Sequence, residues 1–380
     1  MNPQLQKRAH TRMHNLNRLK LGIFAPNCSG GLASTTVPER WNASWDANVE
    51  LIKLAEDAGL EFMLPLARWT GYGGPSDYQG TSLDTLSWAA GLLALSKEIV
   101  VFATVHTAFI HPLVAAKQLA TIDQIGRGRM GLNIVCGWNK PEYDMFGLQM
   151  PDDRAVRYAF GQEWYDVVHR IWCEHEAFDH DGTYFKLRGV KVSPRPFGDS
   201  LPTVLNAGSS GVGYDFAARN ADYLFTVVVD FDKTREEVQK LTALARKLGR
   251  EVDLFTTSYV VCRPTRKEAE EYHDYYANKH ADWPSAERLM MLQGLTDSKS
   301  FPPEMMTRFR TRFAAGHGTY PLVGAPDDIA DELERMSQAG LAGTTISFVD
   351  YNRELPYFVQ EVMPRLERKG LRLAVTKANS

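Results

Sequence analysis

The stretch GLNIVCGWNKPEYD, residues 131–144, joins a short apolar segment to a loop that no hydrophobic core requires. Its first five residues, GLNIV, are apolar apart from Asn133 and predict a buried β-strand. The following mixture of Gly, Trp, Asn, Lys, Pro, Glu and Tyr predicts a loop. A buried strand that ends in such a loop is typical of α/β proteins that bind ligands at the carboxyl ends of their strands.

The same alternation of a short apolar run and a longer helical pattern recurs along the chain. The predicted strands are 20–25, 61–65, 99–105, 131–135, 202–207, 222–229, 254–262 and 344–349. The predicted helices are 45–59, 82–96, 112–125, 153–172, 211–221, 233–249, 266–280 and 355–368. Eight strands, each followed by a helix, predict an α/β fold of the (β/α)8 TIM-barrel class.

An open, doubly wound sheet is the alternative architecture. Its dinucleotide-binding fingerprint places a GxGxxG motif directly after a strand. The one match here, Gly126, Gly128 and Gly131, precedes a strand instead. We therefore interpret this match as chance and favour the barrel.

Two segments depart from a minimal barrel. Residues 174–201 predict a small β insertion before the fifth strand, and residues 281–325 form a long, lid-like excursion before the eighth. We expect a single barrel domain over 19–369, an N-terminal arm over 1–18 and a C-terminal tail over 370–380. The arm is basic but lacks the apolar run of a secretory signal.

Composition points to a small-molecule partner. The chain has 380 residues, is 44% hydrophobic and carries a formal net charge of −3 with dispersed basic residues. A chain with this charge distribution has no basic patch that would bind nucleic acid or an anionic membrane surface. The four cysteines lie far apart without a CxxC pair, which favours a reducing cytoplasm over a disulfide framework or zinc site.

The turn AGSSGVG, residues 207–213, opens directly into a predicted helix. Its backbone N–H groups and the positive end of the helix dipole suit a phosphate, and Ser209 and Ser210 can add hydroxyls. A purely structural alternative is that Ser210 caps the helix. Arg157 and Tyr158 can supply a charged fork and a phenol to the same phosphate, or Arg157 can be a solvated helix residue.

Polar residues at two other strands are further candidates. Thr104 ends the third predicted strand, and Asn133 is a polar group within the fourth that needs partners, either a neighbouring strand or a cofactor. His106 can contact substrate or donate a proton, and it can equally be a packed histidine. Neither His106 nor His111 belongs to a motif with metal-ligand spacing, so we expect no metal site.

Four motifs together resemble the bacterial luciferase-like family of flavin-dependent monooxygenases. They are GLNIVCGWNKPEYDMFG at 131–147, the ATxDQIGxGR pattern at 120–129, RY at 157–158 and AGSS at 207–210. The resemblance covers about residues 19–369 and is strongest to the branch of pyrimidine oxygenase, dimethylsulfone monooxygenase and alkanesulfonate monooxygenase. It implies a (β/α)8 barrel that uses O2 and reduced FMN, the latter supplied by an NAD(P)H-dependent flavin reductase.

The resemblance also implies roles for individual residues. Thr104 and Asn133 would flank the place where O2 meets the flavin, with His106 as a third catalytic candidate. The implied flavin contacts are Ala67, Arg68, Asn133, Trp138, Glu142, Arg157, Tyr158, Ser209 and Ser210. The candidate substrate contacts are Arg68, His106, Trp138, Arg308, Arg310 and Arg312.

This sequence departs from the family pattern at two of these loops. A lysine of the family is replaced by Arg68, which keeps the charge but changes its geometry, and a threonine is replaced by Cys136. The loop after the first strand is closest to the sulfone enzyme, whereas NKPEY at 139–143 is closer to the pyrimidine enzyme. The substrate therefore stays open between organosulfur compounds, such as a sulfone or alkanesulfonate, and pyrimidines or cyclic amides.

We expect a two-component monooxygenase that forms a homodimer or homotetramer. Two other functions fit the same barrel. A deazaflavin-dependent dehydrogenase would transfer hydride and need neither O2 nor a reductase. A non-catalytic flavin-binding protein would show no turnover with reductase, NADH and FMN.

Overall fold

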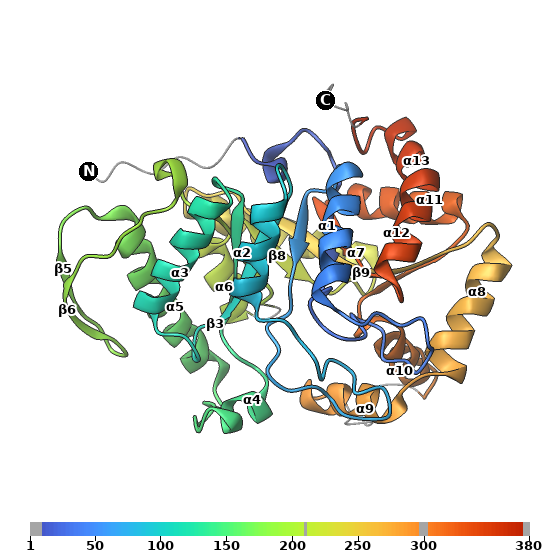
Figure 1. Cartoon of the computed structure of the whole chain (residues 1–380), viewed down its shortest axis with the longest axis horizontal. Coiled ribbons are helices and arrows are strands. Elements are labelled where there is room, and N and C mark those ends of the chain that lie inside the picture. Colours follow the sequence, from blue (N-terminus) through green and yellow to red (C-terminus); the bar gives the residue numbers. More distant parts are fainter. Residues whose placement is uncertain (1–9, 209–210, 296–302, 375–380) are drawn as a thin grey trace. The chain divides into compact units, whose positions relative to one another are not determined.

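The computed structural model describes residues 10–208, 211–295 and 303–374 (Figure 1). It divides the chain into two compact units. The first unit comprises residues 1–15, 84–225 and 241–252, and the second comprises 16–83, 226–240 and 253–380.

The first unit is built on four parallel strands in the order β3-β4-β7-β8. They are β3 (Val100–His106), β4 (Met130–Val135), β7 (Thr203–Asn206) and β8 (Tyr223–Thr226), the last residue of which is counted in the second unit. Every residue of β3 is buried, as expected for a parallel strand covered on both faces.

Helices accompany these strands, and all the α-helices among them except the short α4 correspond to predicted helices. They are α2 (Thr85–Leu95), α3 (Pro112–Ile125), α4 (Lys140–Met145), α5 (Arg154–Cys173) and α6 (Gly211–Asn220), with a short 3-10 helix, η1, at Arg12–His14. The Asp84 and Asp153 side chains cap α2 and α5 by accepting backbone N–H groups. Figure 1 shows α2, α3 and α5 side by side on this unit.

The predicted insertion at 174–201 contains a two-stranded antiparallel hairpin. Its strands are β5 (Phe178–Asp181) and β6 (Lys186–Val190), followed by the 3-10 helix η2 (Phe197–Asp199). Glu163 on α5 holds the turn of this hairpin, because its carboxylate accepts the backbone N–H groups of Thr183, Tyr184 and Phe185. The hairpin is thereby fixed to α5.

The second unit contains five parallel strands in the order β10-β9-β11-β1-β2. They are β1 (Lys20–Phe24), β2 (Phe62–Leu64), β9 (Asp253–Cys262), β10 (Tyr320–Gly324) and β11 (Gly343–Ile346). Its helices are α1 (Trp45–Asp57), α8 (Arg266–Asp274), the π-helix η3 (Tyr275–Lys279), α9 (Trp283–Leu292), α10 (Pro303–Gly316), α11 (Pro326–Gln338), α12 (Tyr351–Glu361) and α13 (Met363–Arg368). Helix α7 (Phe231–Lys247) begins in the second unit and ends in the first.

All eight predicted strands are present, but several boundaries were wrong. The predicted strand 222–229 ends at Thr226, and Val227 and Val229 beyond it are exposed. The excursion 281–325 is not simply a loop, because it contains α9, α10 and β10, which pairs in parallel with β9. Its residues 296–302 lie outside the described part of the chain.

Both predicted terminal extensions have a packed portion. In the first unit, Met13 is buried and its carbonyl accepts a hydrogen bond from the Tyr223 hydroxyl at 2.9 Å. In the second unit, Arg372 is buried and pairs with Glu61 at 2.8 Å. Within the described residues, no helix has the length and apolar character needed to cross a membrane.

Candidate active site

Thr104 and Asn133 lie directly opposite each other on β3 and β4. The Asn133 amide nitrogen donates a hydrogen bond to the Thr104 hydroxyl at 3.1 Å, and both side chains are buried. The structure therefore places these two candidate residues side by side. The neighbouring strand satisfies one end of the asparagine, as the structural alternative required.

The other end of the Asn133 amide is different. Its oxygen Oδ1 is buried and has no hydrogen-bond partner among the described residues. A buried acceptor without a partner costs about 1–3 kcal/mol, so such atoms are rare unless a ligand supplies a donor. A flavin ring carries an N–H group that could serve, and the residues present fit that cofactor at this point.

Thr107 and Asn139 were not predicted and show the same property. The Thr107 hydroxyl and the Asn139 amide oxygen are buried without a hydrogen-bond partner in the part of the chain that the structure describes. Thr107 follows β3, and Asn139 precedes α4. Only the general expectation that loops after strands carry the site could have indicated them from sequence.

His106 and Glu142 form a buried pair at the same end of β3 and β4. The distance from His106 Nδ1 to Glu142 Oε2 is 3.6 Å, and both side chains are almost fully buried. Glu142 lies in the first turn of α4, where the helix dipole favours a carboxylate. The structure thus brings together Thr104, Asn133, His106 and Glu142, four of the predicted site residues.

His111, in contrast, has a structural role. Its ring nitrogen Nδ1 accepts the backbone N–H of Leu113 at 3.3 Å and so caps α3. Within the described residues, no group of three or more His, Cys, Asp and Glu side chains could hold a metal ion.

The NKPEY segment forms the short helix α4, which the sequence did not predict. Phe109, from the loop after β3, stacks on Phe146 with ring centroids 4.3 Å apart and contacts Tyr143 edge-on at 5.0 Å. These contacts hold α4 against that loop. Trp138, proposed as a flavin wall, is half-buried just before α4.

The turn after β7 is packed closely against Tyr158. A Cβ atom added at Gly208 would lie 2.5 Å from the Tyr158 hydroxyl and 2.7 Å from the Gly213 Cα. The Asn206 side chain fixes the turn, since it accepts the Gly208 N–H and donates to the Ile134 carbonyl, both at 2.9 Å. The structure therefore brings Tyr158 to the predicted phosphate turn, whereas Ser209 and Ser210 lie outside the described residues.

Arg157 is bound to the chain that precedes its own helix. Its guanidinium donates to the Asp152 carbonyl at 3.0 Å and also to the Pro151 carbonyl, while its Nε is buried without a partner among the described residues. Nearby, burial raises the pKa of Cys136 to about 12, against the opposing charge of Arg157. This thiol therefore stays protonated at neutral pH and is not a nucleophile.

Ala67 and Arg68 follow β2 in the second unit. Ala67 is half-buried, and Arg68 is buried with its Nε donating to the Gln79 amide oxygen at 3.2 Å. Gln79 in turn contacts Tyr78, whose hydroxyl lies 2.9 Å from His317 Nδ1. The sequence did not indicate Tyr78, Gln79 or His317.

Arg308, Arg310 and Arg312, the three arginines of the excursion that were predicted to contact substrate, do not share one surface role. Arg310 pairs with Glu287 and lies over the Trp283 ring. Arg312 is half-buried and donates to the Thr319 and Val228 carbonyls at 2.6 and 3.0 Å. Arg308 is exposed. Two of these three arginines, Arg310 and Arg312, thus have structural partners in the second unit.

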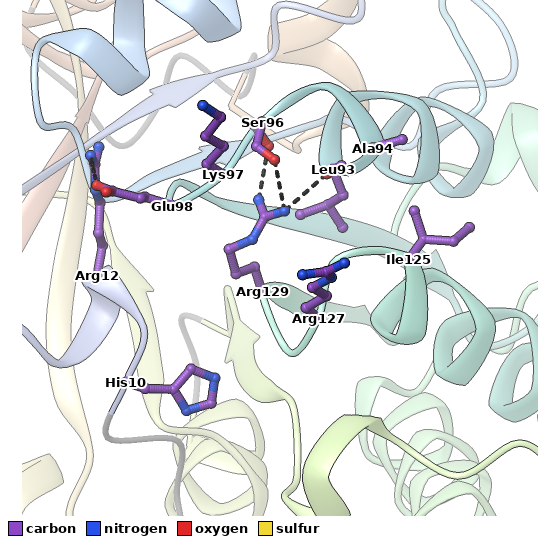
Figure 2. A pocket seen from close by; sticks show the side chains of 10 residues that line it. All are labelled: His10, Arg12, Leu93, Ala94, Ser96, Lys97, Glu98, Ile125, Arg127 and Arg129. Atoms are coloured by element: carbon purple, nitrogen blue, oxygen red, sulfur yellow. Dashed lines mark hydrogen bonds and ion pairs between the residues drawn. The ribbon is translucent and has the colours of Figure 1, made fainter. Parts of the chain in front are cut away.

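The first unit also has a cavity of about 740 Å³ at the amino ends of β3 and β4. Figure 2 shows His10, Arg12, Leu93, Ala94, Ser96, Lys97, Glu98, Ile125, Arg127 and Arg129 around it. Arg129 donates to the Leu93 and Ser96 carbonyls, both at 2.9 Å, and so caps the end of α2. The carboxyl ends of the same strands carry Thr104 and Asn133, so this cavity is not the candidate active site.

Comparison with known proteins supports the family resemblance found in the sequence. A family model described as luciferase-like monooxygenase matches residues 19–343. The pyrimidine monooxygenase RutA of Rhizobium rhizogenes is 30% identical over 362 residues, which are 92% of this chain and 96% of that relative.

Two solved structures are similar over nearly the whole chain. Long-chain alkane monooxygenase (LadA) has a TM-score of 0.83 at 19% identity, covering 96% of this chain and 94% of its own. Riboflavin lyase (RcaE), solved with modified FMN and riboflavin, has a TM-score of 0.82 at 22% identity, covering 95% and 94%. At this identity they show the fold alone, and they confirm the predicted (β/α)8 barrel class.

Proposed function

The chain belongs to the luciferase-like monooxygenase family and is a flavin-dependent monooxygenase, and we propose that it uses reduced FMN and O2 to oxygenate a small organic substrate. The observation that carries this proposal is the buried Asn133 oxygen, which has no hydrogen-bond partner in the described part of the chain and lies beside the Thr104 hydroxyl. It is the kind of acceptor that a flavin ring N–H would satisfy.

The residues proposed to hold the flavin ring include those that lie together near the carboxyl ends of β3 and β4. Asn133 and Thr104 would bind the flavin ring and aim hydrogen bonds at the reacting oxygen, an effect worth a few kcal/mol per donor. The buried His106–Glu142 pair would lie beside the ring, where its polar atoms could contact the substrate or the flavin. Ala67, Arg68 and Trp138 are proposed to border the ring.

The phosphate end of FMN would bind at the turn before α6. Tyr158 contacts this turn, and the first N–H groups of α6 and the Arg157 guanidinium are suitable donors. Ser209 and Ser210 are proposed to add hydroxyls. When bound, the reduced flavin supplies the electrons for oxygen activation, and the protein orients it and excludes water.

The proposed partner is an NAD(P)H-dependent flavin reductase that delivers reduced FMN. The relative named pyrimidine monooxygenase favours a pyrimidine or cyclic amide as substrate. The loop after β1 resembles that of the sulfone enzyme, so a sulfone or alkanesulfonate is the alternative substrate. The cytoplasmic location and the homo-oligomer implied by the resemblance stay predictions.

A side-by-side screen tests the proposal. The purified chain, a generic flavin reductase, NADH and FMN would be supplied with sulfones, alkanesulfonates, pyrimidines and cyclic amides, while oxygen uptake and product are followed together. We expect one substrate class to give product in proportion to NADH. Product formed without O2 would favour the deazaflavin-dependent dehydrogenase, and FMN binding without turnover on any class would favour the non-catalytic protein.

A further inference from the structure

The cavity at the amino ends of β3 and β4 is lined mainly by basic side chains (Figure 2). One carboxylate, Glu98, is present against four cationic side chains, which are Arg12, Lys97, Arg127 and Arg129. The formal net charge of the lining is therefore +3 when histidine is neutral. The volume of about 740 Å³ falls within the range of roughly 300–1,000 Å³ that small-molecule sites occupy. A concave surface with one sign of charge attracts ligands of the opposite sign, so an anion is the expected occupant.

This cavity is separate from the candidate active site. Glu98 and Arg129 lie just before β3 and β4, whereas Thr104 and Asn133 lie farther along these strands, toward their carboxyl ends. Strand β3 has seven residues, and a strand rises about 3.3 Å per residue, so the two ends of β3 are roughly 20 Å apart. A ligand in the cavity would therefore not contact a flavin at the other end.

Arg127 occupies a position in the turn after α3 that favours glycine. The N–H of Arg127 donates to the Gln124 carbonyl at 3.2 Å, and the N–H of Gly128 donates to the Asp123 carbonyl at 3.0 Å. These two hydrogen bonds form the Schellman motif, in which the residue at the position of Arg127 has a positive φ and is usually glycine or asparagine. Arg127 has φ of 48°. An arginine held in this disfavoured conformation indicates that its side chain has a role beyond ending the helix.

The Arg127 side chain is available to a ligand. It is exposed and forms no hydrogen bond or ion pair with any other described residue. Two other cations of the lining already have protein partners, since Arg12 pairs with Glu98 and Arg129 donates to backbone carbonyls at the end of α2. Arg127 is therefore the cation best placed for direct contact, and the others contribute through the positive potential of the cavity.

The ends of α2 and α3 present little negative charge to the cavity. A helix C-terminus is partially negative because its last carbonyl groups lack partners within the helix. At the end of α2, Arg129 donates to the carbonyls of Leu93 and Ser96, both at 2.9 Å. At the end of α3, the turn that contains Arg127 supplies backbone N–H groups to carbonyls of the last turn. The helix ends therefore do not cancel the attraction of the basic side chains for an anion.

An apolar surface adjoins the charged side chains. Leu93, Ala94 and Ile125 form it, and Ile125 is 43% exposed at the end of α3. In the view of Figure 2, Arg127 lies between Arg129 and Ile125. A flat aromatic group can pack on such an aliphatic surface and stack on a guanidinium, while phosphates of the same ligand bind the cationic groups. A nucleoside phosphate combines these two parts.

We propose that this cavity is a binding site for a nucleoside phosphate, with Arg127 as the direct phosphate contact and Leu93, Ala94 and Ile125 as the surface for the base. The site lies away from the proposed flavin position. It therefore goes beyond the proposed monooxygenase function and does not depend on it.

Calorimetric titration of the FMN-loaded protein with ADP, adenosine and inorganic pyrophosphate tests the site. We expect ADP to bind about tenfold or more tightly than adenosine, which lacks the phosphates, and than pyrophosphate, which lacks the base. The flavin absorbance spectrum should not change, because ADP binds away from FMN. Adenosine or pyrophosphate that binds as tightly as ADP, or ADP that displaces FMN, would overturn the proposal.

The same titration without FMN keeps the two proposals apart. The affinity for ADP should be the same with and without FMN, because the two sites do not touch. Failure to bind FMN would contradict the proposed function and leave the nucleotide site standing. Failure to bind ADP in an FMN-loaded protein would do the reverse.

Arg127→Asn removes the proposed phosphate contact without straining the turn. Asparagine tolerates a positive φ better than arginine, so this variant should fold at least as stably as the wild type. Its affinity for ADP should fall about tenfold, because a charge-assisted contact is lost. Thermal unfolding verifies that the variant is folded. An unchanged affinity for ADP would overturn the proposal.

Arg246→Asn is the matched control. Arg246 is an exposed arginine in the last turn of α7, in the same unit but outside the cavity lining. This variant loses the same charge from the chain, so it should keep the affinity of the wild type for ADP. Equal losses in the two variants would assign the effect to net charge and overturn the role of Arg127.

Salt dependence provides a second measurement. Attraction by several charges weakens as salt screens them, so raising the salt concentration from about 50 to about 300 mM should lower the affinity of the wild type for ADP about fivefold or more. The factor should be smaller in Arg127→Asn. An affinity for ADP that does not depend on salt would contradict binding by the charged lining.

Discussion

Asn133 divides its two polar atoms between the protein and the proposed flavin. Its nitrogen is held by Thr104, while its oxygen is buried without a partner among the described residues. We expect Asn133→Ala to lower product formed per NADH by about a hundredfold and the affinity for FMN by less than about tenfold. The reason is that the side chain acts most strongly as charge develops during the reaction.

Stopped-assay product measurement and FMN titration check this prediction. Asn220→Ala is the control, because Asn220 is a buried asparagine of the same unit that bonds Gln162 and Phe216 rather than the candidate site. It should lower stability but not product per NADH. Undiminished coupling in Asn133→Ala would remove Asn133 from the reaction.

At the scale of single residues, the sequence could indicate only those contacts that follow from the pairing of neighbouring strands. Thr104 lies near the end of one predicted strand and Asn133 within the next, and parallel pairing of the two strands places them side by side. Tyr78, Gln79 and His317 were missed because two separate loops meet, and neither loop has a periodic pattern that predicts its conformation. The closeness of Gly208 to Tyr158 was likewise a packing fact with no sequence signal beyond the glycine itself.

At the scale of single elements, the β5–β6 hairpin depends on one carboxylate of α5. Glu163 accepts three backbone N–H groups of the turn and lies 3.2 Å from His180 Nε2. Desolvation raises the pKa of Glu163, but the donors of Phe185, Tyr184, His180 and Thr183 outweigh it and lower the pKa below its ordinary value.

The pH dependence of the hairpin follows from this lowered pKa. A carboxylate with a depressed folded-state pKa contributes stability above its unfolded pKa, about 4.3, and loses it as the pH falls through the folded pKa. Hydrogen exchange at residues 183–185 should show about tenfold lower protection in Glu163→Gln than in wild type at pH 6. The two should converge once the pH falls below the folded-state pKa of Glu163.

Glu176→Gln provides the comparison within the same insertion. Its carboxylate is exposed and lies 4.0 Å from Lys191 Nζ, so its loss should leave the protection of residues 183–185 unchanged. Protection that is independent of pH in the wild type would contradict the role of Glu163.

Helices and strands were predictable where a regular pattern of apolar residues extends over many residues. Helix α3 was predicted with its observed bounds, since an apolar stripe follows Pro112 over fourteen residues. Strand β10 was missed because YPLVG is short, contains a proline and gains its identity only from pairing with β9. Helix α4 has six residues and no side-chain cap, which left it indistinguishable from a loop.

At the scale of the whole chain, a buried ion pair between Arg372 and Glu61 fixes the C-terminal part of the second unit. Arg372 donates to both oxygens of Glu61, at 2.8 and 3.0 Å, and to the Leu19 and Gly59 carbonyls. Glu61 also accepts the Leu21 N–H at 2.7 Å. The predicted tail from residue 370 therefore begins inside the folded unit, which no pattern in a short polar terminus could indicate.

Removing one member of this pair should be costly. We expect Glu61→Gln to lower the free energy of unfolding by about 3–5 kcal/mol, because it leaves the Arg372 charge buried without its carboxylate. Denaturant unfolding measures the change. The exposed Glu271→Gln, which removes only a helical surface pair with Lys267 at 3.7 Å, should change stability by less than about 0.5 kcal/mol. Similar changes in the free energy of unfolding for the two variants would contradict a structural role of the Arg372–Glu61 ion pair.

The fold class was predictable because eight strand and helix patterns in series permit few architectures. The substrate was not, since the loops that select it vary independently of the barrel. The loop after β1 and the NKPEY segment of α4 pointed to different relatives. The side chains of such loops acquire their roles only through contacts like that of Arg68 with Gln79 in the loop after β2.

The central claim is that this chain uses reduced FMN to transfer one oxygen atom from O2 to a substrate. Turnover of the substrate found in the screen under ¹⁸O-labelled O2, with reductase, NADH and FMN, measures this directly by mass spectrometry of the product. The account predicts one labelled oxygen in each product molecule and product in proportion to NADH. Product that carries no label, or that forms equally well without O2, would contradict it.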